Sequence, residues 1–297
     1  MPKKRCCVFT FVKNEKVFLP IWLKYYSRFF DKADIYVLDH DSDDDSIQEC
    51  SRSYGFKVIE LHHDSYDDIW RIEVARQQQA QLLLSYEYVL YADADEIIVP
   101  NPEKYNDLRD YIEKCSLECV VCSGYEMLHI RQKEPAIDLD KSIFKQRKYW
   151  YVNPFYDKPL LANQSLDWIC GFHHAQNKIG IKDNDLWLLH LHKMDYGICW
   201  NKHEQILNYK WNEECIKRNL GFQFRIDNIN DFNKYFDTRH SDFKVLKTLN
   251  SIVWAYVKFR AGSMLSGKGN VLKWDVYKSG FVLITKIPSI LLNIQII

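Results

Sequence analysis

The first hundred residues alternate between short apolar runs and longer segments that carry apolar residues at helical spacing, and this alternation limits the fold more than any other feature. Helices are predicted over Asn14–Phe30 and from Ser65 to about Leu84, the second opening on Ser65-Tyr66-Asp67-Asp68, which resembles an N-cap with acidic first-turn residues. The alternation predicts a doubly wound, mostly parallel α/β sheet with right-handed crossovers and helices on both faces. The predicted strands are Arg5–Val12, Asp34–Asp39, Phe56–Leu61 and Tyr86–Ala92.

Polar clusters follow three of these predicted strands, at the point where each strand ends. They are Lys13-Asn14-Glu15, the loop from Asp39 to Ser46, and Asp93-Ala94-Asp95-Glu96. Parallel sheets of this kind bind ligands outside the carboxyl ends of their strands. The three clusters are therefore predicted to meet at one edge of the sheet and to form a site there.

The acidic cluster that follows the fourth strand is the centre of this predicted site. In extended geometry Asp93 and Asp95 point to the same side, and two such carboxylates repel each other unless a cation lies between them. Mg²⁺ or Mn²⁺, which prefer oxygen ligands, would bind the pair together with the oxygens of a diphosphate. The alternative is a solvated acidic turn or a helix N-cap.

Three segments resemble motifs of the family 2-type glycosyltransferases, which have the GT-A fold. Phe11–Glu15 resembles the opening motif, in which an apolar residue precedes Arg or Lys and then Asn-Glu. Val37–Ser46 resembles the second-strand signature D-x-x-S-x-D-x-[ST], although His40-Asp41 stands where the family often has Asn-Gly. Asp93-Ala94-Asp95 resembles the metal-binding DxD motif. The resemblance covers residues 5 to 100, becomes diffuse up to residue 200, and does not extend into the C-terminal third.

The resemblance implies a glycosyltransferase with a GT-A-like sheet. Such an enzyme moves a sugar from a UDP-, GDP- or TDP-linked donor to a hydroxyl of a glycan or glycolipid, with inversion, and uses Mn²⁺ or Mg²⁺. By the same resemblance Asp95 is the principal metal ligand, Asp93 contacts the ribose or the metal, and Asp39 contacts the base or ribose. The other residues assigned to the nucleotide by this resemblance lie in the opening motif or just before it: Thr10, Val12, Asn14 and Glu15.

Two histidines further along the chain are candidates to complete the metal site. In a strand over Leu186–His192, His190 and His192 face one side, and the leucines between and before them face the other. A downstream histidine often completes the metal site in enzymes of the GT-A type, and a neutral imidazole can bind Mn²⁺. Lys193 would then lie near the phosphates. The alternative is the polar face of an exposed strand.

The catalytic base is assigned to Asp167. Inverting transfer needs a base that takes the proton of the acceptor hydroxyl, and Asp167 precedes Trp168, which could be a platform for a sugar ring. A capping Asp beside a core Trp is the alternative. Arg71 and Arg76 lie on the helix before the acidic cluster and could face the diphosphate, or could form surface ion pairs.

Composition excludes some classes of partner. Lys and Arg total 40, as do Asp and Glu, so the net charge is zero and a nucleic-acid partner is not expected. The 9 cysteines and the lack of a secretory leader indicate free thiols in a cytoplasmic protein. Cys119 and Cys122 face opposite sides of a predicted strand, which argues against a zinc site.

The remainder of the chain is predicted to have two parts. Extended segments are expected over Cys119–Ile130 and Ser142–Val152, and helices from Tyr196 onward. We therefore predict a catalytic domain over residues 1–200 and a helical C-terminal extension over residues 201–297. Its apolar tail, Gly280–Ile297, is interrupted by a lysine and a proline, and is expected to dock on the core, on a partner, or peripherally on a membrane.

Three other functions fit parts of the sequence. A Mg²⁺-dependent nucleotidyltransferase would usually carry a glycine-rich loop after the first strand, where this chain has none. A phosphohydrolase would use Asp93 as its nucleophile but leaves the Asp39–Ser46 signature unexplained. A non-catalytic glycan-binding protein would use aromatic side chains alone and would not need Asp95.

Overall fold

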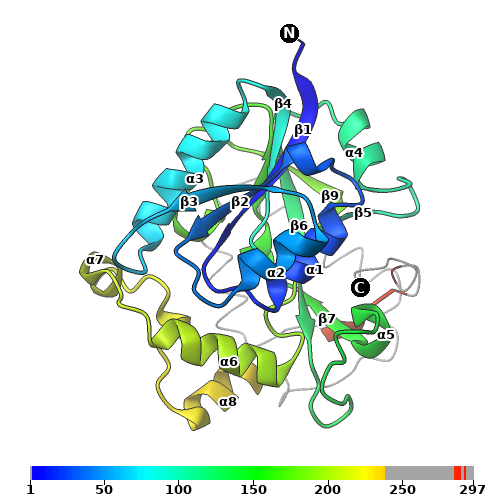
Figure 1. Ribbon diagram of the computed structural model, residues 1–297. Helices are drawn as coiled ribbons and strands as arrows, with labels where there is room; N and C mark the ends of the chain where they lie inside the picture. Colours follow the sequence, from blue (N-terminus) through cyan, green and yellow to red (C-terminus); the bar gives the residue numbers. More distant parts are fainter. Residues whose placement is uncertain (1, 238–283, 289–290, 292–297) are drawn as a thin grey trace.

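The computed structural model describes residues 2–237, 284–288 and 291, and within them the predicted α/β sheet is confirmed (Figure 1). Its first four strands run parallel in the order β3–β2–β1–β4, with Val8 of β1 beside Ile35 of β2 and Leu90 of β4. Their carboxyl ends therefore lie at one edge, as the sequence predicts. These strands are β1 (Lys4–Val12), β2 (Ile35–His40), β3 (Lys57–Leu61) and β4 (Tyr86–Tyr91).

The second half of the sheet is mixed. It continues from β4 through β8, β6 and β7 to β10, while β9 lies along the other edge of β6 and carries β5. Within the described residues β5, β7 and β8 run opposite to the other strands, so the sheet is mostly parallel. These strands are β5 (Glu96–Pro100), β6 (Cys119–Leu128), β7 (Tyr149–Val152), β8 (Pro159–Ala162), β9 (Ile181–His190) and β10 (Ile284–Lys286).

Both faces of the sheet are covered. Residues 8 to 12 of β1 are all buried although their side chains alternate between the faces, so neither face meets solvent there. On one side α1 packs on β5, where the Tyr25 hydroxyl donates to the Ile98 carbonyl at 2.8 Å. The longer helices are α1 (Phe18–Tyr26), α2 (Ser46–Ser53), α3 (Asp68–Leu82), α6 (Tyr196–Leu207) and α8 (Ile229–Asp237). The shorter α-helices and the 3-10 helices are α4 (Leu108–Lys114), α5 (Ile143–Gln146), α7 (Glu213–Lys217), η1 (Lys32–Asp34), η2 (Pro154–Tyr156), η3 (Cys170–Phe172) and η4 (Phe222–Phe224).

Three predicted elements differ from the structure. The first helix begins at Phe18, because Asn14 has a left-handed backbone with φ of 55° and turns the chain after β1. The extended segment predicted over Ser142–Val152 begins as the helix α5 and becomes a strand only at Tyr149. The predicted strand Leu186–His192 ends at His190, so His192 lies beyond the strand.

The helices after Tyr196 confirm the predicted helical extension as far as residue 237 and lie together beyond the carboxyl ends of β1 and β2 (Figure 1). In the tail, Ile287 and Leu291 are buried in the main core, and the backbone N–H of Ile287 donates to the Lys148 carbonyl at 3.0 Å. The rest of the tail lies outside the described residues. A separate domain over 201–297 stays a prediction.

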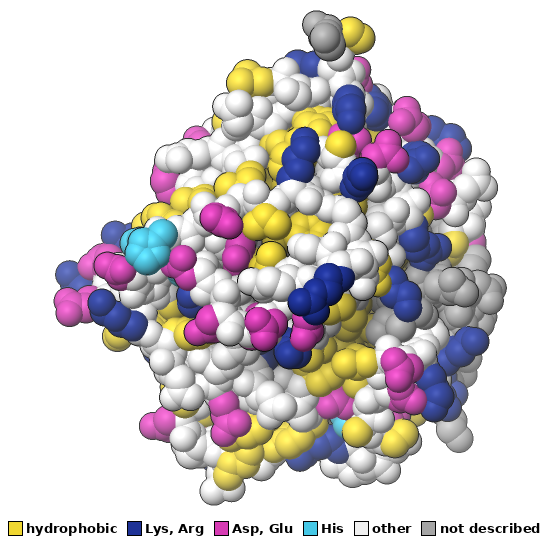
Figure 2. Space-filling model, in the orientation of Figure 1, with side chains coloured by type: hydrophobic (Ala, Val, Ile, Leu, Met, Phe, Trp, Pro, Cys, Tyr) yellow, Lys and Arg dark blue, Asp and Glu magenta, His cyan; other side chains and the backbone are white. Residues whose placement is uncertain are grey.

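Three general properties of the described chain are its surface charge, its cysteines and the apolar character of its helices. Acidic and basic side chains are interspersed over the face in Figure 2, with no field of a single sign. All 9 cysteines are free, and burial raises the pKa of Cys119 to about 11, which keeps its thiol protonated. In the described part of the chain, no helix has the length and apolar character needed to cross a bilayer.

Candidate active site

A cleft of about 1020 Å³ opens at the carboxyl ends of the parallel strands. One part of it is lined by residues at the ends of β1 and β2, by the first turn of α3, and by the turn between β4 and β5. The end of β9 and segments from β6, η2, α6 and η4 line the rest. The cleft thus joins the predicted edge of the sheet to the predicted histidines at the end of β9, and to β6, η2 and η4, which the sequence did not connect with it.

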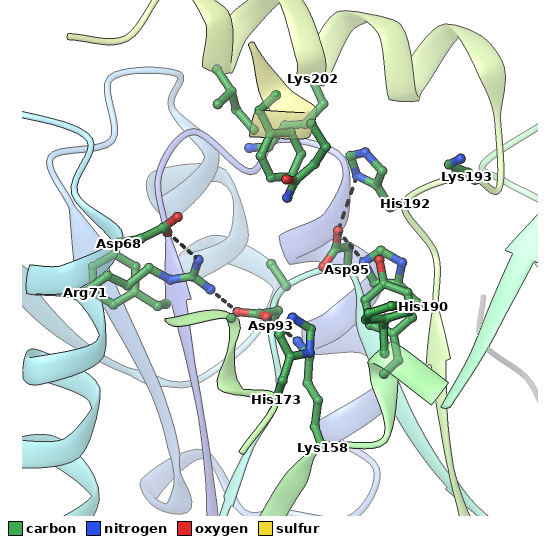
Figure 3. A pocket seen from close by; sticks show the side chains of 18 of the residues that line it. Asp68, Arg71, Asp93, Asp95, Lys158, His173, His190, His192, Lys193 and Lys202 are labelled. Atoms are coloured by element: carbon green, nitrogen blue, oxygen red, sulfur yellow. Dashed lines mark hydrogen bonds and ion pairs between the residues drawn. The ribbon is translucent and has the colours of Figure 1, made fainter. Parts of the chain in front are cut away.

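The turn that joins β4 to β5 separates the two aspartates of the acidic cluster. The backbone N–H of Glu96 donates to the Asp93 carbonyl at 2.9 Å, so the chain reverses here and does not continue as an extended strand. Asp93 and Asp95 therefore have different neighbours (Figure 3). Both carboxylates line the cleft, but they are brought there by a turn and not by the extended geometry that the sequence led us to expect.

Asp93 is held by cations of the protein itself. Arg71 and the Tyr91 hydroxyl donate to its Oδ1 atom, and Lys158 Nζ lies 3.1 Å from Oδ2. Burial alone would raise the pKa of Asp93, but Arg71 and Lys158 outweigh burial and lower it. Asp93 is therefore a charged anchor for two cations, and both of its oxygens are already engaged.

Arg71 and Lys158 extend this charged network to two further carboxylates. Arg71 Nη1 lies 3.6 Å from Asp68 Oδ1, and its guanidinium packs over the rings of Phe11 and Phe172. Lys158 also pairs with Glu96, which is fully buried. Burial raises the pKa of Glu96 and the Lys158 charge offsets this only in part. Alternating charges thus line the cleft in the order Asp68, Arg71, Asp93 and Lys158, and Lys158 links them to the buried Glu96.

Asp95 lies between the two predicted histidines. Its Oδ2 atom is 3.4 Å from His190 Nε2 and 3.5 Å from His192 Nδ1 (Figure 3). A backbone bond from the Leu191 N–H to the Asp95 carbonyl at 2.8 Å fixes this segment against the acidic turn. Burial alone would raise the pKa of Asp95, but the two imidazoles outweigh it and hold the pKa well below its usual value. The structure thus brings Asp95, His190 and His192 together.

The two imidazoles have raised pKa values. Burial lowers the pKa of His190, but the Glu126 and Asp95 carboxylates outweigh it and raise the pKa well above its usual value. Burial also lowers the pKa of His192, and its neighbours Cys199 and Asp95 offset this and raise it to about 9. Among the described residues, none forms a hydrogen bond with the buried Nε2 atom of His192. Both rings therefore favour a proton unless a cation replaces it.

The donor atoms at this point are one carboxylate, which suits Mg²⁺ and Mn²⁺, and two imidazoles, which suit transition metals better than Mg²⁺. Within the described residues, no three or more His, Cys, Asp or Glu side chains are already arranged as a metal site. Mg²⁺ and Mn²⁺ in nucleotide-binding proteins commonly take one or two protein carboxylates and complete their shell with substrate phosphates and water. The side chains present thus match this ion in chemical type, while the histidines now share protons with Asp95.

The loops after β1 and β2 bind each other. The Asn14 N–H donates to Ser42 Oγ at 2.9 Å, and the Asn14 side chain exchanges two hydrogen bonds with Asp43. Asp39 accepts from the Ser42 N–H at 3.1 Å, and neither Asp39 nor Asn14 lines the main cleft. Glu15 does line it and pairs with Lys202 of α6 at 2.7 Å.

The loop after β1 is also fixed from the C-terminal side. Lys202 Nζ and Gln205 Nε2 donate to the Asn14 carbonyl at 3.1 and 3.0 Å. The Tyr209 hydroxyl donates to the Lys13 carbonyl at 3.4 Å. The geometry of this loop therefore depends on residues of α6 and on the segment just after it.

Four further predicted site residues lie away from the cleft, besides Asp39 and Asn14. Thr10 and Val12 are buried in β1, and only the intervening Phe11 reaches the cleft wall. Arg76 donates from Nε to the Trp168 carbonyl at 3.0 Å, so its guanidinium stabilises the fold. Asp167 lies on the surface, and its backbone N–H donates to Asn177.

Trp168 explains why the predicted base and sugar platform are misplaced. Its side chain is fully buried and packs against the rings of Phe9, Tyr91 and Phe172. A ring inside the core cannot bind a sugar, and Asp167 lies on the outer side of the same segment. Asp167 and Trp168 are therefore not part of the cleft.

Several cleft residues were missed in the sequence. Glu126 carried one usable signal, because it is a lone carboxylate within the apolar run of β6. Lys158, just before the apolar β8, carried a similar but weaker one. Lys202 and Tyr156 had none, since their place at the cleft depends on contacts distant in sequence.

Comparison with known proteins gives only distant similarities. No protein-family model and no curated protein sequence matches the chain. Among solved structures, TarS 1-349 of S. aureus aligns at 15% identity and a TM-score of 0.34, over 85% of this chain and 78% of that one. A 4-diphosphocytidyl-2C-methyl-D-erythritol synthase aligns at 15% identity and a TM-score of 0.33, over 55% of this chain and 76% of that one.

A third similar structure is glucosyl-3-phosphoglycerate synthase from Mycobacterium tuberculosis, in complex with Mn²⁺, UDP and glucosyl-3-phosphoglycerate. It aligns at 21% identity and a TM-score of 0.25, over 31% of this chain, which spans only 34% of the synthase. At TM-scores this low, these similarities carry no inference about what this chain binds. The fold and the site rest on the strands and side chains described above.

Proposed function

We propose that this chain is a metal-assisted glycosyltransferase. It would move a sugar from a nucleoside-diphosphate-sugar donor to a hydroxyl of a glycan or glycolipid. The observation that carries the proposal is the convergence of Asp95, His190 and His192 in a large cleft at the carboxyl ends of parallel strands. A cytoplasmic location and a peripheral membrane contact of the tail belong to the same proposal.

Asp95, His190 and His192 are the residues that would hold Mn²⁺ or Mg²⁺. When bound, the ion would neutralise the charge that develops on the diphosphate as it leaves. The protein ligands must give up their protons for this, as is general for imidazole ligands. Asp93 would contribute indirectly, since its oxygens are engaged by Arg71 and Lys158.

Cationic side chains give the cleft an affinity for phosphate. Lys13 and Lys202 line it near the loop after β1, and Arg71 lines it near α3. Charges fixed in this way stabilise negative charge with little rearrangement, because their neighbours already hold them in place. We propose that these residues bind and orient the diphosphate, while Glu15 keeps Lys202 in position.

The structure disfavours one alternative. A phosphohydrolase of the kind considered above needs a carboxylate oxygen of Asp93 that is free to attack phosphorus. Arg71 and Tyr91 engage one oxygen and Lys158 the other, so nucleophilic attack would first have to break these contacts.

Thermal unfolding with nucleotide sugars tests the proposal. UDP-, GDP- and TDP-sugars are each added with and without Mn²⁺ to the wild type, to Asp95→Asn, and to Asp110→Asn. Asp110 lies on α4, away from the cleft, and its loss removes one surface carboxylate. We expect a metal-dependent rise in Tm for one nucleotide class in the wild type and in Asp110→Asn, and none in Asp95→Asn. No response of the wild type to any donor would refute the proposal.

Product analysis then separates the remaining functions. A transferase releases nucleoside diphosphate faster when a hydroxyl acceptor is present, whereas a phosphohydrolase does not need one. If the chain were a non-catalytic glycan-binding protein, the Asp95→Asn variant would bind sugar as well as the wild type does. The anomeric configuration of the product, read by proton NMR, tests the prediction of inversion.

A further inference from the structure

Three strands place a row of polar side chains along the cleft, and a fourth adds a fully buried carboxylate beside them. The β5–β9 register puts Glu96 beside His190, the β6–β9 register puts Glu126 beside His190, and β7 adds Tyr151 beside Glu126. Residues paired across neighbouring strands project to the same face of a sheet. The backbone pairing of β6 and β9 therefore sets Glu126 next to His190, independently of side-chain rotamers.

The contacts of His190 fix its ring from three directions. Glu126 Oε1 lies 2.8 Å from Nδ1, and Asp95 Oδ2 lies 3.4 Å from Nε2. The ring of Tyr156 stacks on the imidazole at a centroid distance of 4.0 Å and an angle of 26°. Glu126 itself is 2% exposed, so its charge is poorly screened by water.

We propose that Glu126 is a positioning residue that prepares His190 to bind a divalent cation. Its carboxylate accepts the Nδ1 proton of His190, and so directs the Nε2 lone pair toward the cation beside Asp95. A carboxylate on the far nitrogen fixes the tautomer and orientation of a ligating imidazole and makes it a stronger donor. This inference rests on the metal site of the proposed function.

A purely structural role for Glu126 makes a different prediction. If the Glu126–His190 contact only stabilised the fold, a neutral replacement would lower the free energy of unfolding without changing the affinity of the folded protein for a cation. Metal affinity, measured on folded protein, therefore distinguishes the two roles. A carboxylate that binds the far nitrogen of a ligating imidazole is expected to raise metal affinity about 10- to 100-fold.

The experiment measures Mn²⁺ binding to the full chain by the loss of the EPR signal of free Mn²⁺. The variant is Glu126→Gln, which keeps the shape of the side chain and removes its charge. The matched control is Asp34→Asn, which removes a buried carboxylate at the opposite end of β2, where Asp34 binds Lys4 and Tyr86. We expect the dissociation constant to rise about 10- to 100-fold in Glu126→Gln and to be unchanged in Asp34→Asn.

A second variant keeps the test decisive if Glu126→Gln does not fold. Glu126→Asp retains the charge but moves it away from Nδ1, so we expect an affinity between those of the wild type and Glu126→Gln. The visible spectrum of bound Co²⁺ reports the ligands directly, and we expect its bands to shift in either variant. Wild-type Mn²⁺ affinity and an unchanged Co²⁺ spectrum in the folded variants would overturn the inference.

The outcomes also separate this inference from the proposed function. If the wild type binds Mn²⁺ and the Glu126 variants bind it equally well, only the role of Glu126 is overturned. If the wild type itself binds no Mn²⁺, the metal site of the proposed function is overturned together with it. Asp95→Asn serves as the reference for loss of a direct ligand.

Discussion

Replacing Lys158 by methionine tests whether the cleft is held together by its buried charges. Lys158 is 3% exposed and pairs with both Glu96 and Asp93. Asp93 keeps Arg71 in the variant, whereas Glu96, which is fully buried, loses its paired cation. Within the described residues, the other hydrogen bond to the Glu96 carboxylate comes from the Asp93 N–H at 3.2 Å.

The expected loss follows from this imbalance. Removing one partner of a buried ion pair costs about 3–5 kcal/mol, because the other charge is left in a medium that solvates it poorly. A domain of ordinary stability has about 5–15 kcal/mol in total, so Lys158→Met should remain folded but be strongly destabilised. Urea denaturation followed by circular dichroism measures the free energy of unfolding.

A double-mutant cycle with Glu96→Gln identifies the cause. We expect the double variant to lose about 0.5–3 kcal/mol less unfolding free energy than the two single variants together, because no unpaired charge is left at position 96. Lys104→Met is the matched control. Lys104 pairs with Asp185 at 2.6 Å on the surface, where water screens the pair, so little change is expected. Additive losses, or a Lys158→Met loss no larger than the control's, would refute the reasoning.

Three further predictions concern the cleft and its supports. Asp67 accepts the N–H groups of Ile69 and Trp70 as the N-cap of α3, so Asp67→Ala should lose about 1 kcal/mol in urea denaturation, and Asp67→Asn much less. Burial alone would raise the pKa of Asp67, but its hydrogen bonds outweigh burial and lower the pKa below 3.8. The ionised carboxylate therefore stabilises the folded protein fully above pH 3.8, and this stabilisation is lost as the pH falls through the lower pKa of the folded state. Unfolding curves of wild type and Asp67→Ala that stay equally far apart in acid would contradict this. Gly124→Ala would place a Cβ 2.5 Å from the Tyr156 backbone, so it should lower the free energy of unfolding by about 1–3 kcal/mol in urea denaturation. An unchanged midpoint of the urea transition would show that η2 can move. EDTA should abolish the Tm rise caused by the donor sugar, and a rise that persists in EDTA would exclude a metal-bound diphosphate.

The part of the fold that could be predicted is the part in which neighbours in sequence are neighbours in space. Strands β1, β2 and β3 pair in chain order through short crossovers, whereas β4 pairs with β1. The apolar runs and the polar residues that end them were sufficient to predict a parallel sheet. The second half could not be predicted in this way. Strand β9 lies between β5 and β6 although it follows both by many residues, and no local pattern specifies such a pairing.

The site shows the same limit at the level of single side chains. Asp95 and His190 were assigned to one site from motif position and strand spacing, and the structure places them 3.4 Å apart. Asp93 was assigned to the ribose or the metal, but a turn and two cations distant in sequence engage both of its oxygens. Trp168 was taken as a sugar platform because sequence does not show which aromatic rings are buried.

The contacts of α6 with the loop after β1 have a practical consequence for anyone who shortens this protein. A fragment cut at residue 200 would divide α6, and would remove Lys202, Gln205 and Tyr209 together. The carbonyls of Lys13 and Asn14 would lose these donors, and the left-handed turn at Asn14 would lose its outer support. A truncated protein could therefore retain its sheet and still fail to bind ligand, so inactivity of such a fragment would say nothing about the intact chain.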